Sequence, residues 1–326
     1  MLQSYRMTYH TDCPVCASES LRELRTHTFD RRGRGGEATA RLLAYYFELF
    51  AEPGADEVRV QIANCLNCGL IFTNPRLSEA DLGRKYAAVA ESDKARRRGR
   101  PHHLADRRRR VSELVQTRLA AAGKPTGADI MDYGGAEGYL LSPLIDRGHR
   151  GYVVDYIDYA REDDRIQYLG PADRAGAGPA RFDFIFLFHV LEHVSDIVGL
   201  LRRLGGMLRP GGTLYVEVPL GAWLEWNELR EPLTHINFFS EQSLAEAVRR
   251  AGLTAGAVST DWQYTTHVNR APCINLLARP AGAAEEKARP RSTAEQLRPL
   301  SELLPALRAN PAYYGKAMLR GLIQTP

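Results

Sequence analysis

A glycine-rich turn between an apolar run and a helical pattern constrains the fold of this chain more than any other feature. Ile130–Gly138 has the sequence Ile-Met-Asp-Tyr-Gly-Gly-Ala-Glu-Gly, and apolar residues at helical spacing follow from Tyr139 to Ile145. Glycine allows a sharp turn and a close approach of the backbone to a ligand. The start of a helix offers unpaired N–H groups to polar ligand atoms. The pattern predicts strand, tight turn and helix, although a turn without a ligand would have the same signature.

Three downstream segments add strands whose ends carry polar residues. Gly151–Asp155 is a short apolar run that ends in an acid, and an acid at this place can accept both hydroxyls of a ribose. Phe182–Phe188 has the continuous apolar pattern of a buried strand and leads directly into His189–His193, which is His-Val-Leu-Glu-His. Leu208–Pro219 contains an Arg-Pro-Gly-Gly turn that leads into another strand.

This series resembles the class I S-adenosylmethionine-dependent methyltransferases, in the branch with "hVLEHv" and "LrPGGtl.vevP" segments. The resemblance covers roughly Ala128–Ala278. It implies an α/β fold with a doubly wound, seven-stranded Rossmann-like sheet that is mainly parallel with one antiparallel strand. Ala255–Asp261 and Cys273–Ala278 are expected to form the last two strands as an antiparallel pair. S-adenosylmethionine is the cofactor that the resemblance implies.

The resemblance also assigns cofactor contacts. Asp132 or Glu137 would meet the methionyl amino group, and Asp155 would take the ribose hydroxyls. Asp158 is a rival to Asp155, but it lies past the apolar strand. The expected cofactor-binding residues are Asp132, Tyr133, Gly134, Gly135, Ala136, Glu137, Gly138, Asp155, Tyr156, Ile157, Phe188 and His189.

The chain departs from the family pattern at two places. Ala136 replaces the middle glycine of the turn, and we expect alanine to be tolerated there with a negative φ. The segment from Tyr159 to Arg181 is short, charged and rich in Gly, Ala and Pro, where the family has a full helix. This composition points to a missing helix and leaves the adenine contact open, with Leu169 and Gly170 as candidates.

Two histidines are the candidate catalytic residues. His189 is expected at the carboxyl end of a strand, where open α/β sheets bind ligands, and it would contact the cofactor's methyl region or act as a base. His235 precedes Asn-Phe-Phe-Ser, a match to the family, and is the second candidate base or else a loop anchor. In the resembling ubiquinone-pathway enzymes a Glu-Val-Leu-Glu-His segment binds a divalent metal. Here His189 replaces the first Glu, so hydrogen-bonding roles for Glu192 and His193 are favoured.

Two Cys-x-x-Cys pairs predict a structural zinc site. Their thiolates can form a tetrahedral four-sulfur cage, and two such pairs make a redox motif the weaker alternative. The ligands would be Cys13, Cys16, Cys65 and Cys68. An N-terminal zinc module with a "C..CgliftnP" ending occurs in the resembling branch, and Cys65–Pro75 matches it. A closed four-ligand site has no open position, so we expect the module to shape the substrate side.

The sequence predicts four parts. Residues 1–76 form the zinc-binding module, 77–124 a helical lid and linker, 125–280 the S-adenosylmethionine-binding domain, and 281–326 a helical C-terminal extension. The linker contains the most basic stretch, Lys94–Arg110. It can be a lid that binds an anionic substrate through arginines, a nucleic-acid patch, or a solvated linker with the exposed start of a helix over Val111–Ala122.

Composition sets the cellular context. The 326 residues are 44% hydrophobic and 25% charged, as in a soluble globular protein. No apolar run approaches the roughly 20 residues that span a membrane, and the N-terminus has no apolar signal-peptide core. We therefore expect a cytoplasmic protein without a membrane partner. The net charge of +4 does not by itself imply nucleic acid, and a homodimer is possible through the C-terminal extension.

These features favour methylation of a small-molecule acceptor. The expected acceptor is a sugar-type or natural-product intermediate, anionic acceptors included, methylated at O, N or C. One alternative is an RNA methyltransferase that uses the zinc module and the arginine-rich segment. The other is a non-catalytic interaction protein that keeps a degenerate cofactor pocket.

Overall fold

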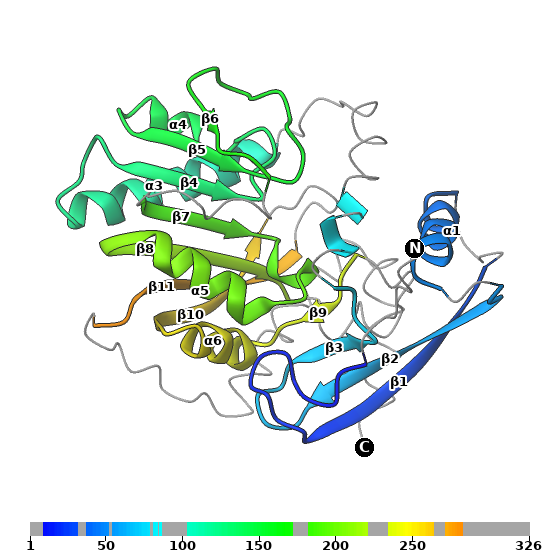
Figure 1. The fold of residues 1–326 in the computed structure, drawn as a ribbon. Helices are drawn as coiled ribbons and strands as arrows, with labels where there is room; N and C mark the ends of the chain where they lie inside the picture. The colour runs from blue at the N-terminus through cyan, green and yellow to red at the C-terminus, as the bar shows by residue number, and fades with distance from the viewer. Residues whose placement is uncertain are drawn as a thin grey trace.

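The computed structural model contains two β-sheets that meet near the middle of the molecule (Figure 1). It describes residues 9–31, 37–51, 54–78, 81–83, 85–86, 103–171, 182–220, 234–263 and 271–282. The basic residues 94–102 and the expected C-terminal helices lie outside the described residues. None of the helices within those ranges is long and apolar enough to cross a membrane.

The larger sheet confirms the predicted fold class. Its seven strands have the order β10-β11-β8-β7-β4-β5-β6. β11 runs antiparallel to both β8 and β10, and the other pairs are parallel, so β11 is the single antiparallel strand. The strands are β4 (Asp129–Tyr133), β5 (Arg150–Val154), β6 (Gln167–Tyr168), β7 (Phe182–Phe188), β8 (Leu208–Pro219), β10 (Leu253–Gln263) and β11 (Ala271–Pro280).

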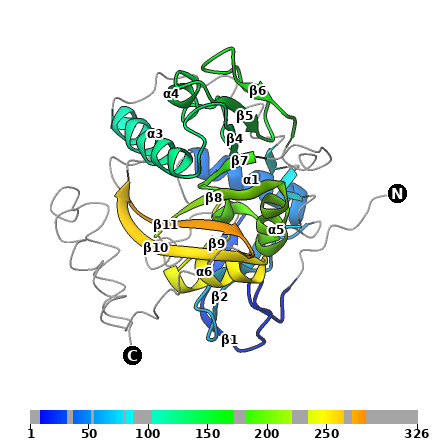
Figure 2. The same cartoon turned by 90° about the vertical axis from the view of Figure 1, so that its left-hand side faces the viewer.

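Helices cover both faces of this sheet because successive strand side chains point to opposite sides. On β7, Phe184 and Phe186 pack with α3 (His103–Ala121) and α4 (Ser142–Ile145). Ile185 and Leu187 pack with α5 (Ile197–Met207) and α6 (Glu241–Arg250) on the other face. Figure 2 shows α3 on one side of the strands and α5 on the other. The sheet is therefore a buried central layer, and its carboxyl edge is left for a ligand.

The helix after the glycine turn is shorter than its sequence pattern. The apolar spacing predicts a helix over Tyr139–Ile145, but α4 begins only at Ser142. Residues 139–141 form turns that continue the glycine segment. Pro143 stands in the first helical turn, where its missing N–H costs no intrahelical bond.

The smaller sheet joins the N-terminal module to the rest of the chain. It has the order β1-β2-β3-β9, formed by β1 (Leu21–Asp30), β2 (Glu57–Cys65), β3 (Ile71–Asn74) and β9 (Asn237–Phe238). α1 (Glu37–Phe50) packs beside this sheet. β9 lies far along the chain, yet Phe238 pairs with Ile71 and Asn237 with Phe72. The module is thus hydrogen-bonded to the segment that follows His235.

A charged cluster closes the amino edge of the large sheet. Asp129 accepts two bonds from Arg150, at 2.6 and 2.9 Å, and lies 2.7 Å from Arg209. Asp183 lies 2.6 Å from Lys124 and 2.7 Å from the same Arg209 nitrogen. The two carboxylates are buried, and the partly exposed cations that contact them compensate their lost hydration.

Asp129 should make the stability of the fold pH-dependent. Burial raises its pKa, but hydrogen bonds from Arg150, Arg209 and Tyr152 outweigh burial and lower it to about 2. A depressed pKa contributes stability above the unfolded value of 3.8, and this contribution is lost as the pH falls towards 2. We expect Asp129→Asn to lower the free energy of unfolding at pH 7 by about 2 kcal/mol, measured by urea denaturation.

The matched control is Asp146→Asn. Asp146 also contacts an arginine, Arg165, at 2.6 Å, but both side chains are more than half exposed. Exposed pairs are worth at most a fraction of a kcal/mol, so this change should cost less than about 0.5 kcal/mol. Equal costs for the two variants would refute the role of the buried cluster.

Candidate active site

The glycine turn follows β4 directly at the carboxyl edge of the sheet. Gly135 lies so close to Asp132 that a Cβ there would be 2.4 Å from the carboxylate carbon. Gly138 has a φ of +77°, and a Cβ on it would be 2.7 Å from the Ile166 side chain. Only glycine fits either place without displacement, so the turn is packed on both sides by neighbouring segments.

Ala136 is a correction to the sequence analysis. We expected a negative φ, but its φ is +49°, in the left-handed region that costs roughly 1–2 kcal/mol for a residue with a Cβ. The turn imposes this conformation because the Ala136 N–H is held by Asp155, which accepts it at 3.0 Å. Alanine therefore takes the glycine conformation instead of altering the turn.

Asp155 bridges the two strand ends at the turn. Its carboxylate accepts the Ala136 N–H through one oxygen and the Ile157 N–H, at 3.1 Å, through the other. Burial raises the pKa of Asp155, and the nearby Glu137 adds to this, while the backbone N–H groups lower it. Each carboxylate oxygen has a further lone pair, so the carboxylate can still accept bonds from a ligand.

The segment after β5 wraps over the turn without forming a helix. Within the described residues 159–171 the only regular element is β6, as the sequence composition suggested. Glu162 donates its N–H to the Glu137 carbonyl at 2.9 Å, and the Tyr168 hydroxyl donates to the Asp155 carbonyl at 2.9 Å. Arg108 of α3 contacts Glu162 at 2.6 Å and lies 4.7 Å above the Tyr139 ring. α3 therefore helps to enclose the turn.

His189 lies at the end of β7 between two carboxylates. Its Nε2 is 3.1 Å from Glu217 and its Nδ1 is 3.4 Å from Glu192. Its φ of +54° is unusual for a residue with a side chain, which often marks a functional position. Burial lowers its pKa, but a hydrogen bond with Cys273 and the two carboxylates raise it well above the ordinary value. The raised pKa favours the protonated ring.

His193 has the opposite electrostatic state. Its Nδ1 lies 2.5 Å from the Thr234 carbonyl, which can only accept, so Nδ1 carries the proton and Nε2 keeps a lone pair. Burial lowers the pKa of His193 to about 3, against the Glu192 carboxylate, which raises it. The His235 ring lies 4.8 Å from the His193 ring. His193 and His235 thus form a pair beside the cationic His189.

Both ring nitrogens of His189 already have partners in this structure. They face the carboxylates of Glu217 and Glu192 at 3.1 and 3.4 Å, and these carboxylates are hydrogen-bond and ion-pair partners for the ring. Both Glu192 oxygens are buried without a hydrogen-bond partner among the described residues, but the His189 cation at 3.4 Å compensates their charge. No reaction step is assigned to a metal at His189, Glu192 and His193.

Four cysteines of the N-terminal module converge on one point. Cys13 and Cys68 have their sulfurs 3.6 Å apart, and Cys16 and Cys65 have theirs 3.5 Å apart. All four sulfurs lie within 4.8 Å of one another. Disulfide sulfurs are about 2.05 Å apart, whereas ligands at 2.3 Å on a tetrahedral ion are separated by about 3.8 Å. The cluster has the spacing of a metal cage.

The local backbone supports this cage. The first knuckle donates the Val15 N–H to the Cys13 sulfur, and the second donates the Cys68 N–H to the Cys65 sulfur, both at 3.5 Å. Ala17 and Gly69, each directly after a second cysteine, have φ values of +56° and +77°. Both knuckles thus make the same tight turn, which aims two sulfurs at one point.

Comparisons with known proteins agree on one domain. Residues 103–257 match the family model described as a methyltransferase domain. This match begins in α3 and ends in β10, so it spans the glycine turn, Asp155 and all three histidines. Residues 103–257 are a methyltransferase domain. Together with the seven-stranded sheet, this confirms the class I fold that the sequence resemblance implied.

Individual relatives share parts of the chain. A ubiquinone biosynthesis O-methyltransferase of Methylocella silvestris is 34% identical over 123 residues, which are 34% of this chain and 47% of that protein. The tRNA 5-carboxymethoxyuridine methyltransferase of Escherichia coli is 32% identical over 110 residues, 30% of this chain and 42% of that protein. The chain thus spans about half the length of these curated relatives.

A solved structure also resembles the chain. The 1,6-didemethyltoxoflavin-N1-methyltransferase of Burkholderia thailandensis, with S-adenosylhomocysteine bound, is similar at a TM-score of 0.47 and 17% sequence identity. The similarity covers 66% of this chain and 96% of that one.

The methyltransferase domain brings the predicted site residues to one edge of its sheet. The glycine turn, Asp155 and His189 follow β4, β5 and β7, and β9 follows His235 directly. Sequence reasoning missed Arg107, which it treated as part of a basic run, and Glu217. An acid inside the apolar strand Leu-Tyr-Val-Glu-Val was the signal for Glu217, because a buried carboxylate needs a compensating partner.

Two further missed residues come from the linker. The Tyr86 ring stacks on Tyr156 with centroids 4.7 Å apart, directly after Asp155. Lys85 is buried, lies 5.0 Å from the Tyr86 ring, and is close enough to His193 to lower its pKa. The described part of the linker therefore packs against the segment after β5 and lies near His193.

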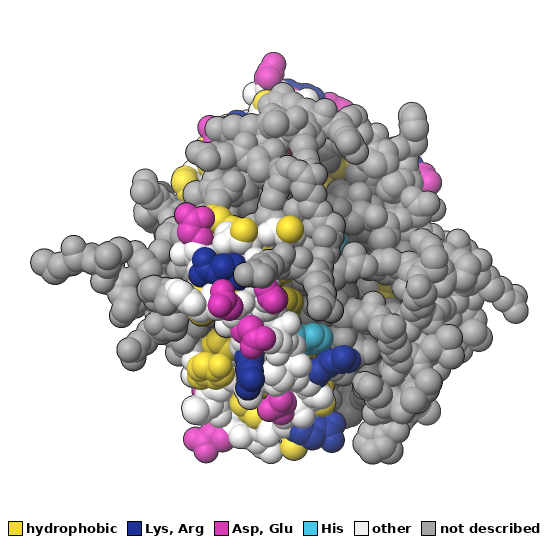
Figure 3. Space-filling view, turned by 90° about the vertical axis from the view of Figure 1, so that its right-hand side faces the viewer, with side chains coloured by type: hydrophobic (Ala, Val, Ile, Leu, Met, Phe, Trp, Pro, Cys, Tyr) yellow, Lys and Arg dark blue, Asp and Glu magenta, His cyan; other side chains and the backbone are white. Residues whose placement is uncertain are grey.

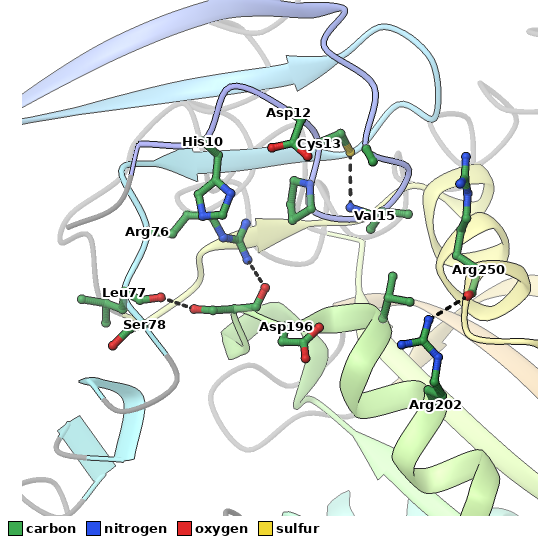
Figure 4. A pocket seen from close by; sticks show the side chains of 14 residues that line it. His10, Asp12, Cys13, Val15, Arg76, Leu77, Ser78, Asp196, Arg202 and Arg250 are labelled. Carbon is green, nitrogen blue, oxygen red and sulfur yellow. Dashed lines mark hydrogen bonds between the residues drawn. The ribbon is translucent and has the colours of Figure 1, made fainter. Parts of the chain in front are cut away.

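A groove of about 690 Å³ lies apart from this edge, between the first cysteine knuckle and the start of α5 (Figure 4). Arg76 lies buried beneath it and donates to the Val194 and Ser195 carbonyls, at 3.1 and 3.2 Å. The Ser195 hydroxyl donates back to the Leu77 carbonyl. These bonds join the N-terminal module to the segment just after His193.

Proposed function

We propose that the protein transfers a methyl group from S-adenosylmethionine to a small-molecule acceptor of a biosynthetic pathway. The observation that carries this proposal is the position of Asp155 over the glycine turn, at the same sheet edge as His189 and His193. The names of relatives from ubiquinone biosynthesis support a small acceptor. A sugar-type or natural-product intermediate, methylated at O, N or C, is the acceptor class we favour.

The cofactor would lie along the turn. Asp155 would accept the ribose hydroxyls, and the Tyr156 and Tyr86 rings would border the adenine. The cofactor supplies an activated methyl group on a sulfonium. The protein's task is to hold donor and acceptor in line and to exclude water from the enclosed edge.

The histidines would have two different roles, a base and a fixed cation. The acceptor would supply the lone pair for the new bond and would lose a proton, for which the site needs a base. His193 Nε2 has a free lone pair, and Glu192 at 3.7 Å stabilises the charge that the ring gains. His235 completes the pair. We infer that His189 acts as a fixed cation. Its neighbours raise its pKa, whereas burial lowers the pKa of His193, and two groups with opposite shifts can serve as cation and base side by side.

Methylation of RNA is the second candidate, and internal pairing of the arginines counts against it. Arg107 and Arg108 contact Glu217 and Glu162, and Arg109 lies near Asp106 and Glu113. Figure 3 shows basic and acidic side chains interspersed on the described part of one face, without a surface of one sign. Binding of a methylatable RNA with a steep salt dependence would favour this candidate instead.

We further propose that Cys13, Cys16, Cys65 and Cys68 bind one structural Zn²⁺. Four converging sulfurs suit zinc, and a closed set leaves no position for catalysis. The module would then have a structural role and would not take part in the chemistry. Its β3 supports the strand that follows His235.

The test of the cofactor role is calorimetric titration of the full chain with S-adenosylhomocysteine. We expect micromolar binding by the natural protein and a loss of roughly 100-fold in affinity for Asp155→Asn, because two hydrogen bonds to a charged group are weakened. Asp158→Asn is the matched control, since Asp158 is an exposed acid in the same loop that contacts Arg161. Its affinity should stay within about threefold of the natural protein. Absence of binding by the natural protein would remove the methyltransferase proposal.

A further inference from the structure

Four charged side chains of alternating sign form a continuous row behind the methyl-transfer edge. Arg107 of α3 lies 2.5 Å from Glu217 of β8, and Glu217 lies 3.1 Å from His189. His189 in turn lies 3.4 Å from Glu192 in the short 3₁₀ helix η1 (Leu191–His193). The row thus connects a helix of the predicted lid with the carboxylate that faces the candidate base.

One oxygen of Glu217 serves both cations. Oε1 is the atom nearest to the Arg107 Nη2 and to the His189 Nε2. Glu217 and Arg107 have side chains only 1% and 8% exposed, so water hardly screens their interaction. The His189 side chain is 27% exposed and can reach a ligand. Any change at Arg107 therefore reaches the exposed ring through a single buried atom.

Arg107 itself is fixed from a second side. Its guanidinium lies 5.4 Å from the centroid of the Phe188 ring, and Phe188 directly precedes His189. The His189 backbone N–H donates to the Glu217 carbonyl at 2.9 Å, so Glu217 also holds the main chain of His189. The arginine is packed against both residues that determine where the histidine lies.

We propose that Arg107 is a positioning residue of the methyl-transfer site, which orients the Glu217 carboxylate and through it the His189 ring. The proposal rests on the proposed function, since it assumes that His189 serves methyl transfer. Arg107 shares the Glu217 carboxylate with His189. Because Glu217 interacts with both cations, it attracts the His189 ring less strongly than it would without Arg107.

The sign of each change follows from the groups around the ring. Glu217 comes from β8, Glu192 from η1 and the Cys273 thiol from β11, and Arg107 contacts Glu217. Loss of the Arg107 charge removes a nearby cation and should raise the pKa of His189. Loss of the Glu217 charge should lower it.

The test is a proton NMR titration of the histidine rings in the full chain, with His189→Asn to assign the signal. We expect Arg107→Met to raise the His189 midpoint, and Glu217→Gln to lower it, by about one pH unit each. Arg108→Met is the matched control, because it removes the same charge from the same helix but its partner is Glu162. That control should move the midpoint by less than about 0.3 pH unit.

Kinetics then distinguish positioning from folding. The kcat of Arg107→Met should fall about tenfold with a smaller change in KM, and Arg107→Lys should recover much of it because the charge remains.

An unchanged His189 midpoint in Arg107→Met, or an equal shift in Arg108→Met, would overturn the proposal. If Arg107→Met does not fold, the Lys and Glu217→Gln variants decide by the same midpoints. A chain that binds no cofactor would refute the proposed function, whereas the NMR result would still decide the Arg107 contact.

Discussion

Removal of the metal from the four-cysteine cluster is expected to abolish methyl transfer while cofactor binding persists. Cys65 ends β2, β2 pairs with β3, and β3 pairs with β9, which begins two residues after His235. Structural zinc supplies folding free energy to small modules, so its loss should release this chain of strands. The glycine turn follows β4 of the other sheet, whose α3–α4 face has a core without module residues. The opposite face of that sheet shares a core with the cysteines.

Cys65→Ser is the variant to measure. We expect less than one zinc per chain, a loss of kcat of roughly 100-fold or more because a displaced base no longer meets the acceptor, and S-adenosylhomocysteine affinity within about tenfold of the natural protein. Chelation followed by zinc addition is the control within one sample, and it should restore activity. Full activity in a metal-free chain would show that the module does not support the site.

Replacement of His193 by glutamine is expected to have the second largest effect. Glutamine can donate to the Thr234 carbonyl as Nδ1 does, but it has no basic nitrogen to receive a proton. General-base catalysis contributes typically 10²- to 10⁴-fold, and a base whose pKa lies well below the operating pH belongs at the lower end of that range, so kcat should fall by about 100-fold with cofactor affinity unchanged. Since the pKa of His193 is lowered to about 3, this residue should cause no loss of kcat between pH 6 and 8 in the natural protein.

His149→Gln is the matched control for His193. His149 is also buried, burial lowers its pKa as well, and its ring contacts Ala128 and Gln116 at the amino edge of the sheet. Its replacement should lower stability but leave kcat within about threefold. If His193→Gln retains kcat and His235→Gln loses it, the role of base belongs to His235.

Much of the fold was predictable because it rests on local patterns. Phe182–Phe188 has the bounds expected from the sequence, since a continuous apolar run needs burial on both faces. Leu208–Pro219 is a strand throughout, although its Arg-Pro-Gly-Gly segment was expected to form a turn before the strand. The ends of α6 also depend on local residues, because the Ser240 side chain accepts the Ser243 N–H at its start and Gly252, with a φ of +78°, follows its last turn. The pattern after Gly138 was misleading, because apolar spacing cannot show that the glycine turn continues as far as Leu141.

The site was predictable only as a set of residue types. Asp155 and His189 were expected at strand ends, where any parallel sheet gathers side chains. The protonation state of each histidine was not predictable, because it depends on neighbours from other elements. His189 meets Glu217, whereas His193 meets a backbone carbonyl, so two histidines four residues apart take opposite states.

The sequence by itself determined the strands, the glycine turn, the two cysteine knuckles and the order in which they occur, because each depends on residues close together in the chain. Only the tertiary structure decided that β9 extends the cysteine module's sheet and that Arg107 meets Glu217 across 110 positions. Such contacts form between surfaces that each look ordinary in sequence. A buried charge needs a partner, and only the fold shows which residue that partner is.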